Sequence, residues 1–335
     1  KGRSGFVRAY IVRRIAIMVL LLLLLTFAVF ILFSLLPADV ARLTCGKTCT
    51  EATLELNRTR LGLDKSVLEQ FWMFLSGIFV GRTYPGGAQP IVCQAPCLGY
   101  SFTRNAPVLQ LIGERLPATI FLALGAFVLF LAVGILAGIY SALRRGRVQD
   151  KTVTGVSLVA YSLPAFFIGL VLIFFVILRW KLLPFPSYVA PWQDPVRFVQ
   201  TMILPWIVLA ILYAAFYTRL TRSQMLETLS SDFIRTARAK GLPERTVIRK
   251  HAFRAGLTPI VTAAGLDLAG LLGGAVITET IFSLPGIGSF AVSAVTNPDQ
   301  AILVGVTLVT ATFVIVANLV VDILYAAIDP RVRLT

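Results

Sequence analysis

The four cysteines are the residues whose spacing most directly predicts covalent chemistry. They form two pairs with three residues between the partners, Cys45 with Cys49 and Cys93 with Cys97. In an oxidising compartment, four cysteines in one segment predict two disulfides, in any of three connectivities. A metal site built from all four thiolates is the alternative, although zinc sites more often use Cys-x-x-Cys spacing. We therefore expect disulfides rather than a metal.

Asp267 is an acidic residue inside an apolar stretch, 257–282. An ionisable side chain at such a depth in a membrane is costly and usually functional. It could line a water-filled pathway and attract the ammonium group of a peptide or another cation. Alternatively, it could be protonated or hydrogen-bonded at a contact with a second subunit. The sequence places no lysine or arginine at comparable depth, so we expect the partner of Asp267 to lie outside this chain.

The residues that catalysis or nucleotide binding would need are not assembled in this sequence. His251 is the only histidine, and no set of partners for a metal or a catalytic triad accompanies it. The phosphate-binding pattern Gly-x-x-x-x-Gly-Lys-Ser/Thr does not occur. We therefore expect no enzyme activity and no cofactor in this chain, and we expect its energy to come from a partner or an ion gradient.

Six apolar stretches, each long enough to cross a bilayer, are the elements that must position Asp267 and the segments between the spans. The 335 residues are 57% hydrophobic and 14% charged, which is far from the composition of a soluble protein. The net charge of +15 lies between the apolar stretches rather than on a polar surface, which argues against nucleic-acid binding. The sequence therefore predicts an all-α integral membrane protein with spans at 15–36, 118–143, 154–177, 198–218, 257–282 and 301–327.

Proline and glycine predict details of these spans. Pro164 and Pro205 should kink their helices, which a bundle tolerates because neighbouring helices satisfy the freed carbonyl groups. Two Gly-x-x-x-Gly patterns, at 134–138 and 270–274, permit close approach of a second helix. We expect both patterns to be packing seams rather than substrate contacts.

The distribution of lysine and arginine predicts the orientation of the chain. Most of the 31 basic residues fall in 1–14, 144–153, 219–256 and 328–335, whereas 283–300 has none. The positive-inside rule then places both termini in the cytosol. The expected organisation is a cytosolic N-terminus and first span at 1–36, a small external domain with the cysteines at 37–117, and a five-helix core at 118–335 that includes a cytosolic loop at 219–256.

A basic segment at 232–254 stands out within this loop. Ser231 or Asp232 can cap a first helix, Gly241 suits its left-handed end, and Pro243 suits the first position of a second helix. The second helix would combine a basic face with a narrow apolar strip, made of Val247, Ile248, Ala252 and Ala255. Such an element could be a solvated loop, an amphipathic helix on anionic lipid, or a docking site for a cytosolic protein. The residues alone leave all three open.

This segment resembles the cytosolic loop of bacterial ABC importer permeases. Their pattern is Glu-Ala-Ala, three residues and Gly; here Thr236-Ala237-Arg238 takes the first place, and Gly241 lies four residues after Ala237. "ARAKGL" followed by "HAFR" resembles the dipeptide/oligopeptide/nickel subfamily. The likeness continues in "LGLDKSVLEQFWMFLSGIFVG" (61–81), "LGYSFTRNAPVLQLIGERLPATIFLAL" (98–124), "GGAVITETIFSLPGIG" (273–288) and "NLVVDILYAAIDPRVR" (318–333).

The resemblance implies the transmembrane subunit of an ATP-driven importer in the bacterial plasma membrane. It implies a second homologous permease, two ATPase subunits that use ATP and Mg, and an external solute-binding protein as partners. Alternating access would be driven through the 232–254 segment. The substrates implied are di- or oligopeptides, with nickel chelates or glutathione also open. The residues expected to couple the chain to the ATPases are Thr236, Ala237, Arg238, Ala239, Lys240, Gly241, Leu242, Arg245, His251 and Arg254.

An ion-coupled secondary transporter that works without an ATPase is the alternative. Asp267 is its main support. Such carriers usually show internal repeats and several ionisable groups within the membrane, and we find neither here. The sequence therefore favours the ATP-driven permease.

Overall fold

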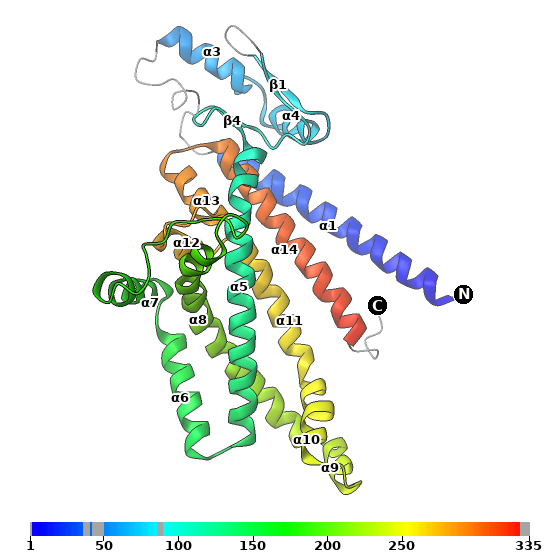
Figure 1. Cartoon of the computed structure of the whole chain (residues 1–335). Coiled ribbons are helices and arrows are strands. Elements are labelled where there is room, and N and C mark those ends of the chain that lie inside the picture. The colour runs from blue at the N-terminus through cyan, green and yellow to red at the C-terminus, as the bar shows by residue number, and fades with distance from the viewer. Residues whose placement is uncertain (1, 36–40, 42–49, 86–89, 329–335) are drawn as a thin grey trace. The chain divides into compact units, whose positions relative to one another are not determined.

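The structure is a computed structural model that describes residues 2–35, 41, 50–85 and 90–328 (Figure 1). Among the described residues, five helical stretches are long and apolar enough to cross a membrane. They are Ile15–Leu32, Val108–Leu143, Pro195–Leu229, Glu244–Leu272 and Gln300–Val320. A bent pair of helices, Val148–Ser162 with Ala165–Arg179, makes a sixth if it is counted as one span. The largely helical membrane protein expected from the sequence is confirmed.

The chain divides into two compact units. The first unit comprises Lys1–Pro117 and Gly286–Phe313, and the second comprises Ala118–Pro285 and Val314–Thr335. Two of the three boundaries fall inside helices, α5 (Val108–Leu143) and α14 (Gln300–Ile328), and the third lies between Pro285 and Gly286. The first unit therefore extends the expected external segment with a second stretch of chain that lies far along the sequence.

The first unit begins with α1 (Gly2–Leu35), α3 (Glu51–Leu61) and α4 (Val67–Val80). Ser66 starts α4 through a capping box, in which its side chain and that of Glu69 each accept a hydrogen bond from the other's backbone N–H. Two short antiparallel hairpins follow, β1 (Arg82–Tyr84) with β2 (Ile91–Cys93), and β3 (Tyr100–Ser101) with β4 (Ala106–Pro107). The sequence did not predict these strands.

The core of the first unit joins residues from both stretches of chain. Val108, Ile112, Ile287, Phe290 and Ile302 are among its buried apolar side chains. They come from the start of α5, from α13 (Ile287–Thr296) and from the start of α14. A smaller cluster places Phe30 of α1 with Phe74 of α4 and Val304 of α14.

The second unit is organised around one long helix, α8 (Pro195–Leu229). Asp194 caps α8 by accepting a hydrogen bond from the N–H of Arg197, and Pro195 fills its first turn. Its neighbours include α6 (Val148–Ser162), α7 (Ala165–Leu172), α11 (Phe253–Leu272) and α12 (Val276–Ile281). Pro205 lies inside α8, which remains one continuous helix.

Two predicted spans differ from the structure. The stretch at 154–177 is not a single kinked helix, because the chain bends by 97° between α6 and α7 at Leu163 and Pro164. The segment after the bend continues as a π-helix, η1 (Ile173–Arg179). The stretch at 257–282 ends earlier than expected, since α11 stops at Leu272 and a separate short helix, α12, follows.

Three glycines of α5 allow close contact with α8. A Cβ atom added at Gly125 would lie 2.1 Å from the Trp206 side chain, at Gly134 2.5 Å from Tyr217 Cβ, and at Gly138 2.6 Å from Thr221 Cβ. The Gly-x-x-x-Gly pattern at 134–138 is therefore a packing seam, as predicted. An added Cβ at Gly270 meets no atom within 4 Å, so the structure shows no seam at that position.

Candidate functional site

The basic segment forms two helical pieces with a sharp turn between them. The first is α9 (Asp232–Ala239), with Ser231 at its N-cap position. Gly241 has a φ of 73°, the left-handed conformation that glycine adopts without strain. Its N–H donates to the carbonyl of Arg238, and that of Leu242 donates to the carbonyl of Ala237, which is the Schellman pattern. The predicted helix, turn and helix is therefore present.

The second piece is not a separate loop helix. Pro243 is the N-cap of α10 (Glu244–Thr246) rather than its first helical residue, so the helix begins one residue later than predicted. The chain continues through a π-helical segment, η2 (Val247–Ala252), directly into α11. The expected loop at 219–256 is therefore mostly helix, because α8 also runs on to Leu229. Figure 1 shows α9 and α10 at the joined ends of α8 and α11.

The apolar strip of the second piece is occupied within the chain. Val247 and Ala252 are fully buried against Ile234 and Ala237 of α9 and Met225 of α8, whereas Ala255 is exposed. Val247 and Ala252 therefore pack η2 against α9 and are not available to a separate molecule. Most of the residues left for a partner are polar or basic.

The two pieces are also joined by an ion pair across the turn. Arg238 donates from Nη2 to Glu244 Oε1 at 2.7 Å and from Nε to Oε2 at 3.1 Å. The bond to Glu244 raises the pKa of the Arg238 guanidinium, which therefore stays charged. Both side chains are about half exposed, at 44% and 55%.

The residues expected to couple the chain to an ATPase lie mostly on one exposed surface. Ala237 is buried, His251 is half-buried, and the others are exposed: Thr236, Arg238, Ala239, Lys240, Gly241, Leu242, Arg245 and Arg254. Phe233 of α9 is exposed by 49% and Leu242 by 38%, so two apolar side chains interrupt the basic surface. We call this set, with Phe233 added, the 232–254 surface. The sequence reasoning missed Phe233.

An ion pair between a buried carboxylate and a half-buried arginine holds the turn between α5 and α6 to α8. Arg222 of α8 donates to Asp150 of α6 from Nε at 2.7 Å and from Nη2 at 2.8 Å. The hydroxyl of Ser141 and the N–H of Gly146 donate to the same carboxylate, at 2.6 and 2.9 Å. The Asp150 side chain is 5% exposed. The sequence gave no signal for this pair, because 72 residues separate its partners.

Asp267 has a partner within the chain. The hydroxyl of Tyr217 donates a hydrogen bond to Asp267 Oδ2 at 2.6 Å. Tyr217 is fully buried, and its ring stacks on Phe130 of α5 at a centroid distance of 5.1 Å. The prediction that Asp267 has no partner within the chain is therefore wrong, because a neutral phenol can donate to a carboxylate as well as a lysine or arginine can.

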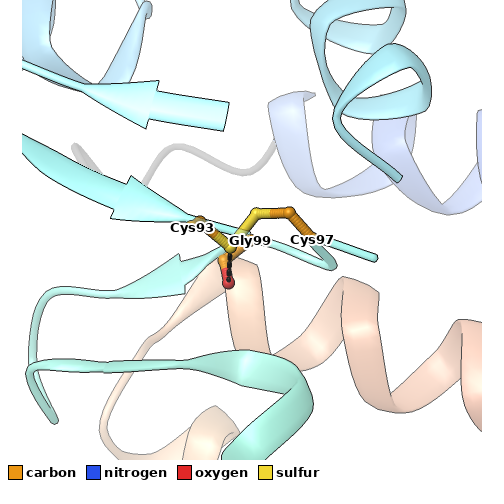
Figure 2. The surroundings of a disulfide bond; sticks show 3 residues. All are labelled: Cys93, Cys97 and Gly99. Carbon is orange, nitrogen blue, oxygen red and sulfur yellow. Dashed lines mark hydrogen bonds between the residues drawn. A yellow bond between two sulfur atoms is a disulfide. The ribbon is translucent and has the colours of Figure 1, made fainter. Parts of the chain in front are cut away.

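Among the residues of the first unit that the structure describes, one disulfide is present. Cys93 and Cys97 are bonded, and Cys93 Sγ lies 3.8 Å from the carbonyl oxygen of Gly99 (Figure 2). Because a disulfide sulfur carries no proton, this approach is a contact rather than a donated hydrogen bond. The bond also removes both thiolates as metal ligands. The predicted pair Cys45 and Cys49 lies outside the described residues.

A buried carboxylate in the first unit was also missed by the sequence reasoning. Asp299 caps α14, since the N–H of Ile302 donates to its Oδ1 at 3.2 Å. The hydroxyls of Ser101 and Thr103 donate to its Oδ2. These bonds tie the β3–β4 hairpin to the start of α14. Among the described residues, no three His, Cys, Asp or Glu side chains are grouped to hold a metal ion.

Two family descriptions together cover nearly the whole chain. Residues 134–334 match the binding-protein-dependent transport system inner membrane component, and residues 7–123 match the N-terminal part of the membrane component of the same transport systems. The chain belongs to this permease family. It is therefore a multi-pass inner-membrane component of a transport system, and its own role is that of a permease subunit rather than an enzyme.

Named relatives span the same length as this permease. A putative peptide transport system permease protein of Brucella abortus is 37% identical over 327 residues, which cover 97% of this chain and 99% of the relative. The dipeptide transport system permease protein DppB of Escherichia coli is 34% identical over 349 residues, covering 97% and 98%. Full coverage in both directions makes this permease comparable to them over its whole length.

The fold is also shared with a solved transporter. Two inward-facing crystal forms of the MetNI methionine ABC transporter match with TM-scores of 0.51 and 0.53, at 17% and 18% identity. The match covers 66% of this permease and 97% of the solved chain. At this identity the likeness is one of fold.

Proposed function

We propose that this permease moves di- or oligopeptides into the cell as one subunit of an ATP-driven importer. It would work with a second homologous permease, two ATPase subunits that bind ATP and Mg, and an external solute-binding protein. The peptide substrate is suggested by the names of the relatives from Brucella abortus and Escherichia coli. The family membership supports the binding-protein partner.

The observation that carries the proposal is the 232–254 surface. Its apolar strip is already buried inside the chain, so its basic residues, Phe233 and Leu242 remain available to a partner. A basic surface with a few apolar anchors is typical of a protein interface rather than of a surface that only follows the positive-inside rule. We assign this surface to the ATPase, which lies in the cytosol together with both termini.

The connections of the surface support a mechanical role. α9 follows α8 after two residues, and α10 and η2 run without a break into α11. Burial of Ile234, Met225 and Val247 in one cluster makes α9, the end of α8 and η2 a single packed body. A rigid-body movement of the ATPase would then reach two membrane spans at once.

Asp267 is proposed to contribute to the pathway for cationic substrates. Its carboxylate is half-buried and accepts a bond from Tyr217, so it has remaining acceptor capacity. Asp267→Asn should then lower uptake of lysine-containing dipeptides more than uptake of neutral ones. Equal uptake of both would assign Asp267 to packing between α8 and α11.

The proposal is tested by uptake into proteoliposomes. The permease, reconstituted with its partner permease, ATPases and binding protein, should accumulate peptide with ATP and continue to do so in the presence of a protonophore. The permease alone should accumulate none. Active accumulation by the lone chain, driven by an ion gradient, would support the ion-coupled alternative instead.

Gly241 offers a test of the surface itself. Its left-handed backbone strains any other residue, although no atom lies within 4 Å of an added Cβ. Gly241→Val should therefore distort the turn and reduce co-purification of the ATPase or the uptake per ATP. Gly62→Val introduces the same residue at a left-handed position of the first unit, where an added Cβ lies 3.1 Å from the Met73 side chain; it is the control and should retain both. Normal assembly and uptake in Gly241→Val would contradict the assignment.

A further inference from the structure

The turn between α5 and α6 is connected to the 232–254 surface through one carboxylate. Asp150 accepts hydrogen bonds from three elements: Ser141 at the end of α5, Gly146 in the turn and Arg222 in α8. All four bonds are 2.9 Å or shorter. An ionised carboxylate has about four acceptor positions, so this one is fully used and leaves none for a ligand.

Arg222 lies on α8 between contacts that join this helix to α5, α9 and η2, so the pair with Asp150 links several helices. One turn further along the helix, Met225 is 1% exposed and packs with Ala142 of α5, Ile234 of α9 and Val247 of η2. Immediately before Arg222 in α8, Thr221 is closely approached by Gly138 of α5. The polar pair therefore lies between two tight contacts that join the same helices.

The burial of Asp150 and the bidentate geometry of the pair argue for a mechanical role. Moving a charge pair out of water costs free energy that its own attraction repays only with good geometry and additional hydrogen bonds. Apolar contacts at Gly138 and Met225 already hold α5 to α8, so adhesion alone does not require an ion pair at this point. A bidentate Arg–carboxylate pair also fixes the orientation of the two side chains, because the planar guanidinium forms both hydrogen bonds in only one alignment with the carboxylate.

We propose that Asp150 and Arg222 are positioning residues that transmit movement of the 232–254 surface to α5 and α6. The proposal rests on the proposed function, since it supplies the path by which ATP-driven movement reaches two further helices. With the pair intact, the α5–α6 turn and the end of α8 move as one body. Without the pair, α8 and α11 move with the ATPase, whereas α6 moves less.

The first experiment compares uptake with ATP hydrolysis in the reconstituted complex. Asp150→Asn and Arg222→Gln should still assemble and hydrolyse ATP, but the peptide transported per ATP should fall about tenfold. Arg222→Lys, which keeps the positive charge but cannot form the bidentate pair, should transport more peptide per ATP than Arg222→Gln. Arg219→Gln is the control, because it removes an exposed cation one turn away on the same helix. A transport ratio equal to wild type in both Asp150→Asn and Arg222→Gln would overturn the proposal.

A second measurement does not depend on the variants folding. Spin labels at Val148→Cys of α6 and Glu227→Cys of α8, both exposed, would be placed in a Cys45→Ser, Cys49→Ser background. Their distance should be the same in the nucleotide-free and vanadate-trapped complex, with trapping verified by retained ADP. A distance that differs between the two states would overturn the proposal.

The two hypotheses fail in different ways. A wild-type complex without ATP-driven uptake would end the proposed function. If the wild-type complex couples normally and the Asp150→Asn and Arg222→Gln variants couple equally well, only the proposed role of Asp150 and Arg222 would end.

Discussion

Two arginine–carboxylate pairs in the second unit have nearly the same geometry and opposite surroundings. Arg222 and Arg238 each donate two hydrogen bonds to a carboxylate, from Nε and Nη2, at distances of 2.7 to 3.1 Å. The Arg222–Asp150 pair is 28% and 5% exposed, whereas the Arg238–Glu244 pair is 44% and 55% exposed. The first joins residues 72 positions apart, the second residues 6 apart.

The difference indicates what each region is for. An exposed pair contributes little to stability, because water and salt screen it, so Arg238 and Glu244 mainly order a local turn. A buried pair is costly to break, since the remaining charge loses its partner in a place that water reaches poorly. The region around Asp150 therefore maintains the internal connection of the helices, while the 232–254 surface remains open to a partner.

The largest expected effect comes from removing the buried carboxylate. Asp150→Ala should lower the free energy of unfolding by about 3 kcal/mol, because Arg222 is left without its counter-ion. Titration of the purified permease with dodecyl sulfate in mixed micelles measures this change. Asp232→Ala, which removes a fully exposed carboxylate, is the control. A loss below about 1 kcal/mol would mean that water compensates Arg222 and that the two regions do not differ.

The glycine seam beside the buried pair should be the next most sensitive. Gly134→Ala places a methyl group 2.5 Å from Tyr217 Cβ and should cost about 1 to 3 kcal/mol of unfolding free energy. Gly155→Ala in α6 meets no atom within 4 Å and should instead be neutral or stabilising by about 0.5 kcal/mol. The same titration compares the two. Equal effects would show that α5 and α8 separate easily at this seam.

Substitution on the 232–254 surface should affect binding and leave stability unchanged. Phe233→Ser removes an exposed aromatic anchor, so its unfolding free energy should stay within about 0.5 kcal/mol of wild type. Its affinity for the ATPase should fall about tenfold, measured by binding of purified ATPase to permease in nanodiscs. Val148→Ser, at an equally apolar and more exposed position outside this surface, should bind normally. Unchanged binding by Phe233→Ser would place the interface elsewhere.

The smallest effect is expected at the exposed pair itself. A double-mutant cycle of Arg238→Gln and Glu244→Gln should give a coupling energy below about 1 kcal/mol, and less at high salt. The unfolding titration at low and high ionic strength provides the measurement. A coupling as large as that of the buried pair would remove the distinction between the two regions.

Much of the architecture was predictable because it depends on local composition. Apolar stretches long enough to span a bilayer predicted the membrane helices, and Gly241 predicted the turn between α9 and α10. Pro164 predicted a kink, but the size of the 97° bend depends on how α7 packs against α8 and α12. The hairpins at 82–107 are too short to leave a periodic signal.

The sequence by itself determined the class of protein, four of the six spans and the basic segment, since hydrophobicity and charge act residue by residue. Only the tertiary structure decided which polar groups meet. Asp150 with Arg222, Asp267 with Tyr217, and Asp299 with Ser101 are distant in sequence and lie on different elements. The tertiary structure also decided that the buried apolar residues of η2 pack against Ile234 and Ala237 of α9. Such pairings follow from how helices pack, which no single stretch of sequence contains.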